Sequence, residues 1–138
     1  FFPSLSPDGR YVVYAADDNG QFDIYRQEIG NRDRINLTPG VAEDDTQPAF
    51  SPNGAYVAFR SERASGRGIF VIPASGGEPR LISDSGYHPS WSPDGSEIVV
   101  SSFGRDVPTV RASSGRHGLT VINVASGLRR EVDPAQTF

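Results

Sequence analysis

The chain of 138 residues carries 13 basic and 17 acidic side chains, and this net charge of −4 argues against a nucleic-acid partner. It has no run of 18 apolar residues, so membrane insertion is not expected. The absence of Cys excludes disulfides and leaves the cellular compartment unknown.

A repeated motif divides the chain into three units. Ser-Pro-Asp-Gly or Ser-Pro-Asn-Gly occurs at 6–9, 51–54 and 92–95, so the units are 45 and 41 residues apart. Proline presets φ and glycine supplies a positive φ, so each tetrad is predicted to form a tight turn. A period near 40 residues with four short strands per unit is typical of a β-propeller blade.

Each unit is predicted to hold an inner, a second, a third and an outer strand. The second and third strands are rich in β-branched and aromatic residues, and no segment has a sustained helical period. The fold class is therefore all-β, with blades of four antiparallel strands. In chain order the predicted strands are 3–6, 10–16, 22–29, 34–38, 48–51, 55–61, 68–74, 80–83, 89–92, 96–102, 118–125 and 129–132.

The stretches "PSWSPDGSEIVVSS" (89–102) and "DIYRQEIGNRDRINLTPG" (23–40) resemble the repeat of TolB-type β-propellers. The resemblance covers the whole chain and implies three blades, at about 1–44, 45–85 and 86–133. The third unit departs from the pattern, because it lacks Asp-Ile-Tyr and carries a long loop. Similar blades occur in TolB, which implies a periplasmic location, and in the gating domains of prolyl-oligopeptidase-like peptidases and the sensor regions of bacterial signalling proteins.

Three blades do not make a ring. A propeller usually closes with four to eight blades, and an open arc leaves two apolar faces in water. We therefore expect either a homodimer that closes a six-bladed ring or the remaining blades of a longer parent chain. A fragment that assembles into a closed ring fits the same pattern. Residues 134–138 are a candidate start of the next inner strand.

The candidate binding face lies opposite the tetrad turns. The loops before each inner strand and those between the second and third strands share this face and vary between units. They mix acids with arginines, which suits a protein or peptide ligand, although an ordinary solvated surface has the same composition. The candidate residues, of which Gln47 and His88 are predicted to face the central channel, are Asp45, Gln47, Arg63, Arg67, Tyr87, His88 and Arg105.

No catalytic constellation is apparent in the sequence. It has no G-x-S-x-G motif and only two His, so we expect no enzyme activity, cofactor or metal site. The tetrad acids are predicted to cap backbone N–H groups, and Trp91 is predicted to be blade core rather than a binding platform. The predicted function is a non-catalytic protein- or peptide-binding scaffold. The alternatives are part of the gating propeller of a serine peptidase, or a sensor region of a bacterial signalling protein.

Overall fold

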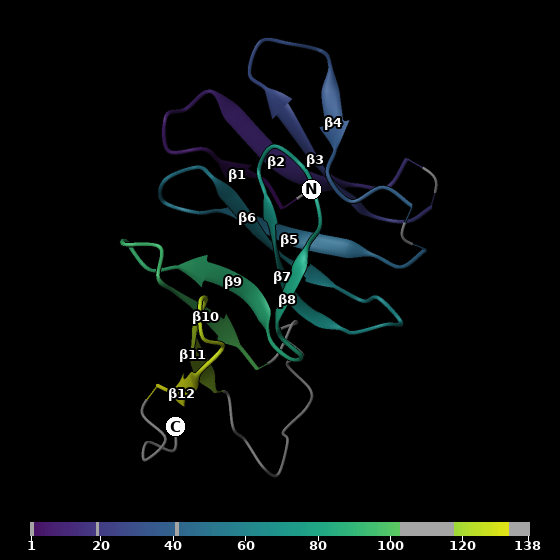
Figure 1. Cartoon of the computed structure of the whole chain (residues 1–138). Helices are drawn as coiled ribbons and strands as arrows, with labels where there is room; N and C mark the ends of the chain where they lie inside the picture. Colours follow the sequence, from purple (N-terminus) through teal and green to yellow (C-terminus); the bar gives the residue numbers. More distant parts are fainter. Residues whose placement is uncertain (1, 19, 41, 103–117, 133–138) are drawn as a thin grey trace, which may run out of the picture.

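The computed structural model describes residues 2–18, 20–40, 42–102 and 118–132. These residues form three four-stranded antiparallel sheets that lie one after another along the molecule (Figure 1), as predicted. The described residues contain no helix long and apolar enough to cross a membrane. We refer to the sheets β1–β4, β5–β8 and β9–β12 as blades one, two and three. Their strands are β1 (Ser4–Leu5), β2 (Tyr11–Ala16), β3 (Asp23–Glu28), β4 (Arg34–Asn36), β5 (Asp45–Phe50), β6 (Tyr56–Ser61), β7 (Gly68–Pro73), β8 (Arg80–Ser83), β9 (Tyr87–Trp91), β10 (Glu97–Ser101), β11 (Leu119–Asn123) and β12 (Arg129–Glu131).

The three tetrads form the tight turns that the sequence predicts. In the first, the Gly9 N–H donates to the Ser6 carbonyl at 2.9 Å, and Gly9 has a φ of 73°. The Asp8 carboxylate accepts from the Ser6 hydroxyl at 2.7 Å and from the Arg10 N–H at 3.0 Å. These bonds hold the pKa of Asp8 below its usual range, and the bond from the Ser6 hydroxyl has the largest effect. The predicted capping role of the tetrad acids is thus confirmed.

Two of the three inner strands begin earlier than predicted, because pairing continues across a backbone irregularity before their prolines, whereas β1 begins at Ser4, one residue after the predicted start. β5 starts at Asp45 and β9 at Tyr87, whereas the sequence suggested starts at 48 and 89. Gln47 and His88, each directly before a proline, have φ values of 58° and 53°. Proline cannot donate to the ladder, and the pairing shifts register at this point and continues beyond it.

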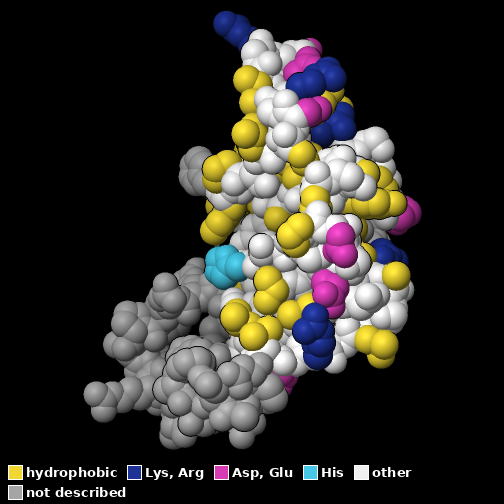
Figure 2. All heavy atoms as spheres, turned by 90° about the vertical axis from the view of Figure 1, so that its left-hand side faces the viewer, with side chains coloured by type: hydrophobic (Ala, Val, Ile, Leu, Met, Phe, Trp, Pro, Cys, Tyr) yellow, Lys and Arg dark blue, Asp and Glu magenta, His cyan; other side chains and the backbone are white. Residues whose placement is uncertain are grey.

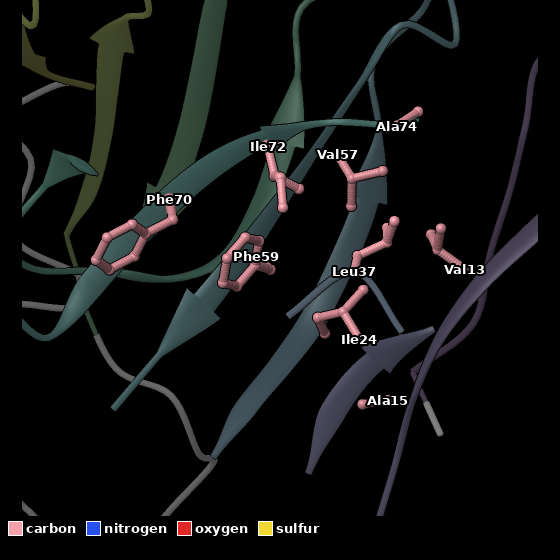
Figure 3. Packing of buried hydrophobic residues seen from close by; sticks show 9 residues of the cluster. All are labelled: Val13, Ala15, Ile24, Leu37, Val57, Phe59, Phe70, Ile72 and Ala74. Carbon is pink, nitrogen blue, oxygen red and sulfur yellow. The ribbon is translucent and has the colours of Figure 1, made fainter. Parts of the chain in front are cut away.

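Blades one and two pack through a continuous apolar layer (Figure 3). Val13 and Ile24 of blade one meet Val57 and Phe59 of blade two, and all four are fully buried. The alternation of side chains along a strand places these residues on facing sides of the two sheets. Such burial stabilises the stack by about 1.5–3 kcal/mol for each large apolar side chain.

Blades two and three pack through a second apolar layer. It joins Ile69 of blade two to Ile98 and Ile122 of blade three, all of them fully buried. Trp91 packs against this layer but is only half-buried, and its indole N–H donates to the Ala49 carbonyl at 3.0 Å. Trp91 therefore packs on the blade core as predicted, while one side of the indole borders a groove.

Each end blade keeps one face that no other described blade covers. Leu5 in blade one occupies the position of Phe50 and Trp91 in the later inner strands, yet it is 59% exposed. On the far face of blade three, Leu119 is 48% exposed. The two uncovered faces therefore expose apolar side chains, as expected for three blades that do not close a ring.

Candidate functional site

Two predicted site residues, Gln47 and His88, meet where the inner strands of blades two and three begin. The His88 backbone N–H donates to Oε1 of Gln47 at 2.7 Å. Both residues have the left-handed backbone that precedes each inner-strand proline. A non-glycine residue in this conformation costs free energy, and such strain is often found at binding sites. Their contact joins the Gln47 side-chain amide to the backbone of His88, at a rim of the molecule formed by the starts of these two inner strands.

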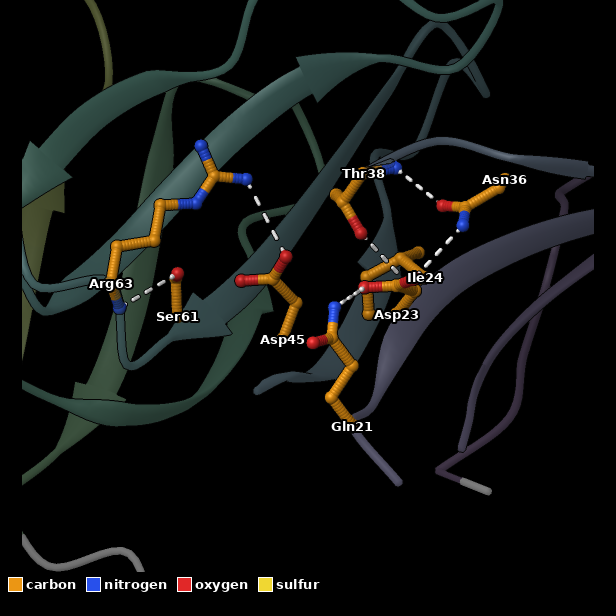
Figure 4. Close-up of polar contacts among 8 residues, drawn as sticks. All are labelled: Gln21, Asp23, Ile24, Asn36, Thr38, Asp45, Ser61 and Arg63. Atoms are coloured by element: carbon orange, nitrogen blue, oxygen red, sulfur yellow. Dashed lines mark hydrogen bonds and ion pairs between the residues drawn. The ribbon is translucent and has the colours of Figure 1, made fainter. Parts of the chain in front are cut away.

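The structure also brings together Asp45 and Arg63 (Figure 4). Nη2 of Arg63 lies 3.5 Å from Oδ2 of Asp45, whose side chain is fully buried. The Arg63 guanidinium also lies 4.9 Å from the centre of the Phe70 ring. Oδ1 of Asp45 and Nε of Arg63 are buried and have no hydrogen-bond partner. A buried ion pair with unsatisfied atoms is poorly solvated, so its charges strongly affect each other.

The burial of Asp45 changes its titration. Loss of solvent raises the pKa of the Asp45 carboxyl above its usual range, and this outweighs the lowering by Ser61, Arg63 and Thr38. A raised carboxyl pKa means that the folded state binds the proton more tightly than the unfolded state. Asp45 therefore adds stability at low pH and loses that contribution as the pH rises through its folded-state pKa.

A network of hydrogen bonds in blade one continues this cluster (Figure 4). The Asn36 amide donates to Asp23 at 2.9 Å and accepts from the Thr38 N–H at 2.9 Å. The Thr38 hydroxyl accepts from the Ile24 N–H at 3.0 Å. The Asp45 N–H donates to the Phe22 carbonyl, which ties β5 to the blade-one loop. The last of these bonds fixes the start of β5, where Asp45 lies.

Arg60 belongs to the same rim, although sequence reasoning missed it. Its side chain is 6% exposed, pairs with Glu62 and donates to the Gly86 carbonyl at 2.9 Å. Its guanidinium lies 4.1 Å from the centre of the ring of Tyr87, which is a predicted site residue. The available signal was the charge itself, since Arg60 interrupts the apolar run "YVAFRS" of a strand buried on both faces.

The remaining predicted residues do not join this cluster. Arg67 is exposed, and Arg105 lies outside the described residues. The expected mixture of loop acids with loop arginines is also partly wrong. Asp18 pairs with Arg34 and Asp84 with Arg129, and both arginines come from outer strands. In the described part of the chain, no three His, Cys, Asp or Glu side chains are placed to hold a metal ion.

Repeated four-stranded blades with a polar rim at the inner strands define a β-propeller module. The chain belongs to the TolB beta propeller domain family, whose model matches residues 1–129. It is 33% identical over 110 residues to the uncharacterized protein Atu1656 of Agrobacterium fabrum, covering 78% of this chain and 37% of that protein. It is 32% identical over 94 residues to the Tol-Pal system protein TolB of Hydrogenovibrio crunogenus, covering 66% of this chain and 21% of that protein.

Solved structures agree with this assignment. A putative TolB from Agrobacterium tumefaciens superposes with a TM-score of 0.74 at 25% identity, covering 93% of this chain and 47% of that chain. A puromycin hydrolase superposes with a TM-score of 0.66 at 16% identity, covering 94% of this chain and 21% of that chain, which shows likeness of fold alone. The chain thus spans less than half the length of the relatives that it matches.

Proposed function

We propose that this chain is a non-catalytic scaffold that binds a protein or peptide at the rim of its inner strands. The observation that carries the proposal is the contact between Gln47 and His88, which joins two blades through strained backbone at a partly exposed position. The rim is built on strands, so its side chains are held in place more firmly than those of a free loop. An extended segment would bond there to the amide and imidazole groups of the rim.

The buried pairs behind the rim support the same proposal. Asp45 with Arg63, and Arg60 with Tyr87, tie the second blade to its own loops and to blade three. These groups stiffen the rim rather than contact the ligand, since Asp45 is fully buried and Arg60 nearly so. The family includes Tol-Pal system proteins, whose name places them in a multi-protein system, and this favours a protein partner. The sequence-based alternative of a gating propeller is the second candidate, because the chain is 30% identical over 109 residues to the uncharacterized peptidase YuxL of Bacillus subtilis, covering 72% of this chain and 16% of that protein.

Peptides that bind the chain can be selected from a displayed random library. Their affinity for the double variant Gln47→Ala/His88→Ala is expected to be at least about tenfold lower than for the unchanged chain. The loss follows from the removal of both side chains at the rim. Affinity would be measured by calorimetry, with folding of the variant checked by circular dichroism. Arg32→Ala, in the exposed turn between β3 and β4, is the control and is expected to leave affinity unchanged. Peptides whose affinity does not change with the double variant would refute the rim as the binding site.

We further propose that the uncovered faces of blades one and three pack against other blades, either of a second copy or of a longer parent chain. Tyr14 and Tyr25 stack on the free face of blade one with ring centres 6.0 Å apart, as Phe59 and Phe70 do at 5.8 Å where blade two meets blade one. The same side-chain arrangement therefore recurs on a face that is still open.

The isolated 138-residue chain is accordingly expected to form a dimer. Light scattering at about 100 μM should give close to twice the monomer mass of 14.9 kDa. Leu119→Arg, which places a charge on the free face of blade three, should return the chain to a monomer. A wild-type chain that scatters as a monomer at this concentration would contradict closure by a second copy.

A further inference from the structure

A groove runs between blades two and three at the edge that carries the tetrad turns. Figure 2 views the molecule from this edge, where hydrophobic side chains emerge between acidic and basic ones. The groove has a volume of about 500 Å³, which is within the range of small-ligand sites. It lies opposite the rim discussed above, and nothing in the proposed scaffold function uses it. The lining residues that matter here are Tyr56, Val71, Glu78, Arg80, Trp91 and Asp94.

The corresponding place between blades one and two serves as an internal comparison. The ladders of the two blades are in the same register, since Tyr11 pairs with Glu28 in blade one and Tyr56 pairs with Pro73 in blade two. Arg26, opposite Val13, therefore corresponds to Val71, opposite Ala58. The two grooves thus differ at one central position, where the first has a guanidinium and the second an isopropyl group.

In the first groove, the chain's own arginine fills the space. Nη1 of Arg26 donates to the Ala74 carbonyl of blade two at 2.5 Å. The same guanidinium lies 5.1 Å from the centre of the Tyr11 ring, and the Arg10 guanidinium lies 5.4 Å from it. A cation over an aromatic face is attracted by the ring quadrupole. The fold therefore accommodates a guanidinium between two blades, over a tyrosine.

In the second groove, the aromatic side chains remain, but no arginine of the described chain lies over them. Tyr56 replaces Tyr11 and is 45% exposed, and Trp91 is half-buried. Arg80 lines this groove, and its Nη2 donates at 2.9 Å to the Val124 carbonyl, which is equivalent to the Ala74 carbonyl that Arg26 reaches. The two interfaces thus share the bond from guanidinium to carbonyl, and the second differs in leaving its aromatic faces without a cation over them.

Acidic groups border the open aromatic faces. Glu78 and Asp94 line the groove together with one basic residue, Arg80. These three side chains give the groove a net charge of −1. Bonds from the Ser96 N–H, the Ser92 hydroxyl and the Ser96 hydroxyl lower the pKa of Asp94 to about 2, so it is ionised at neutral pH. A cation that enters the groove meets both negative charge and aromatic rings, with tryptophan the most favourable of these.

We propose that the groove between blades two and three binds the guanidinium of an arginine side chain presented by a partner protein. The arginine would lie beside Tyr56 and Trp91, with Glu78 within reach of its charge. It would place in trans a guanidinium over the tyrosine of the groove, as Arg26 does in cis one blade earlier. The proposal is independent of the rim, because the two sites lie at opposite ends of the strands.

Trp91 is the sole tryptophan of the chain, so its fluorescence reports on this groove. Titration of the 138-residue chain with N-acetyl-arginine amide is expected to give a saturable change, with a dissociation constant in the range of about 1 mM. N-acetyl-citrulline amide has nearly the same shape but no charge, and it should bind at least about fivefold more weakly. Equal responses to the two probes, or no saturable change, would overturn the proposal.

Two variants test the assignment of the residues. Glu78→Gln should weaken arginine-amide binding about two- to fivefold, whereas Glu131→Gln, an exposed acid outside the groove, should leave it unchanged. Val71→Arg restores the arginine of the first groove and should abolish the saturable response. If circular dichroism shows that Val71→Arg does not fold, the test depends on Glu78→Gln. A loss of arginine-amide affinity in Glu78→Gln that is no larger than the loss in Glu131→Gln would refute the site.

Discussion

Phe59→Ala is expected to lower the free energy of unfolding by about 3–5 kcal/mol. Phe59 is fully buried between blades one and two, where its ring stacks on Phe70 at 5.8 Å. The substitution removes this stacking and leaves a cavity next to Val13 and Ile24, in sheets whose strands have little freedom to collapse into it. Urea unfolding followed by circular dichroism measures the loss.

Tyr14→Ala is the matched control for this prediction. Tyr14 occupies the same ladder position in blade one, and it stacks on Tyr25 as Phe59 stacks on Phe70. It faces away from blade two and is only partly buried, so its truncation should cost much less at concentrations where the chain is monomeric. Equal losses for the two variants would contradict the assignment of Tyr14 to an uncovered face.

The elements of this fold are predictable because each signal is local and occurs three times. The tetrads at 6–9, 51–54 and 92–95 combine a proline, a capping side chain and a glycine, and each of these acts within its own turn. The inner strands are less predictable. Proline marks them, but the shift in pairing around Pro48 depends on the neighbouring strand β6, which the local sequence does not specify.

The rim is only partly predictable, because the contacts between blades do not repeat as the strands do. Asp45 in blade two and Gly86 in blade three are equivalent positions, two residues before the left-handed residue. A Cβ on Gly86 would lie 2.6 Å from Cγ2 of Val100, so no side chain fits there. The Arg60 side chain reaches the bare Gly86 carbonyl instead. The carboxylate at this position pairs with an arginine of its own blade, whereas the backbone oxygen at the equivalent position accepts from an arginine of the preceding blade, a difference that no single repeat reveals.

The partial exposure of Trp91 belongs to its position in the repeat, since Phe50 is also only partly buried. Phe50 and Trp91 occupy the same position in successive inner strands, and both pack at the edge of an apolar layer. The side chain opposite is Arg26 in the first groove and Val71 in the second, and only the arginine is long enough to cover its groove. The two positions therefore differ in the side chain across the groove, about twenty positions earlier in the chain, rather than in their own partial burial.

Arg63→Met is expected to lower the free energy of unfolding by about 3 kcal/mol at about pH 7, because it leaves the Asp45 carboxylate buried without a cation. The stem of methionine replaces much of the contact that the Arg63 side chain makes with Phe70. The loss should therefore come mainly from the uncompensated charge. Urea unfolding at several pH values separates these contributions.

The pH dependence follows from the direction of the Asp45 shift. Burial already raises the pKa of this carboxyl, and removal of Arg63, which lowers the pKa, should raise it further. A raised carboxyl pKa stabilises the fold when the group is protonated, and this contribution is lost as the pH rises. The deficit of Arg63→Met relative to wild type should therefore shrink by at least about 1 kcal/mol between about pH 7 and about pH 4.5.

The double variant Asp45→Asn/Arg63→Met removes both charges and tests the same cause. It should be more stable than Arg63→Met alone at neutral pH, because a neutral amide costs less to bury than an unpaired carboxylate. The difference in free energy of unfolding between the double variant and Arg63→Met should disappear in acid, where Asp45 is protonated. A deficit of Arg63→Met that is independent of pH, or a double variant no more stable than the single one, would show that the lost packing on Phe70 dominates.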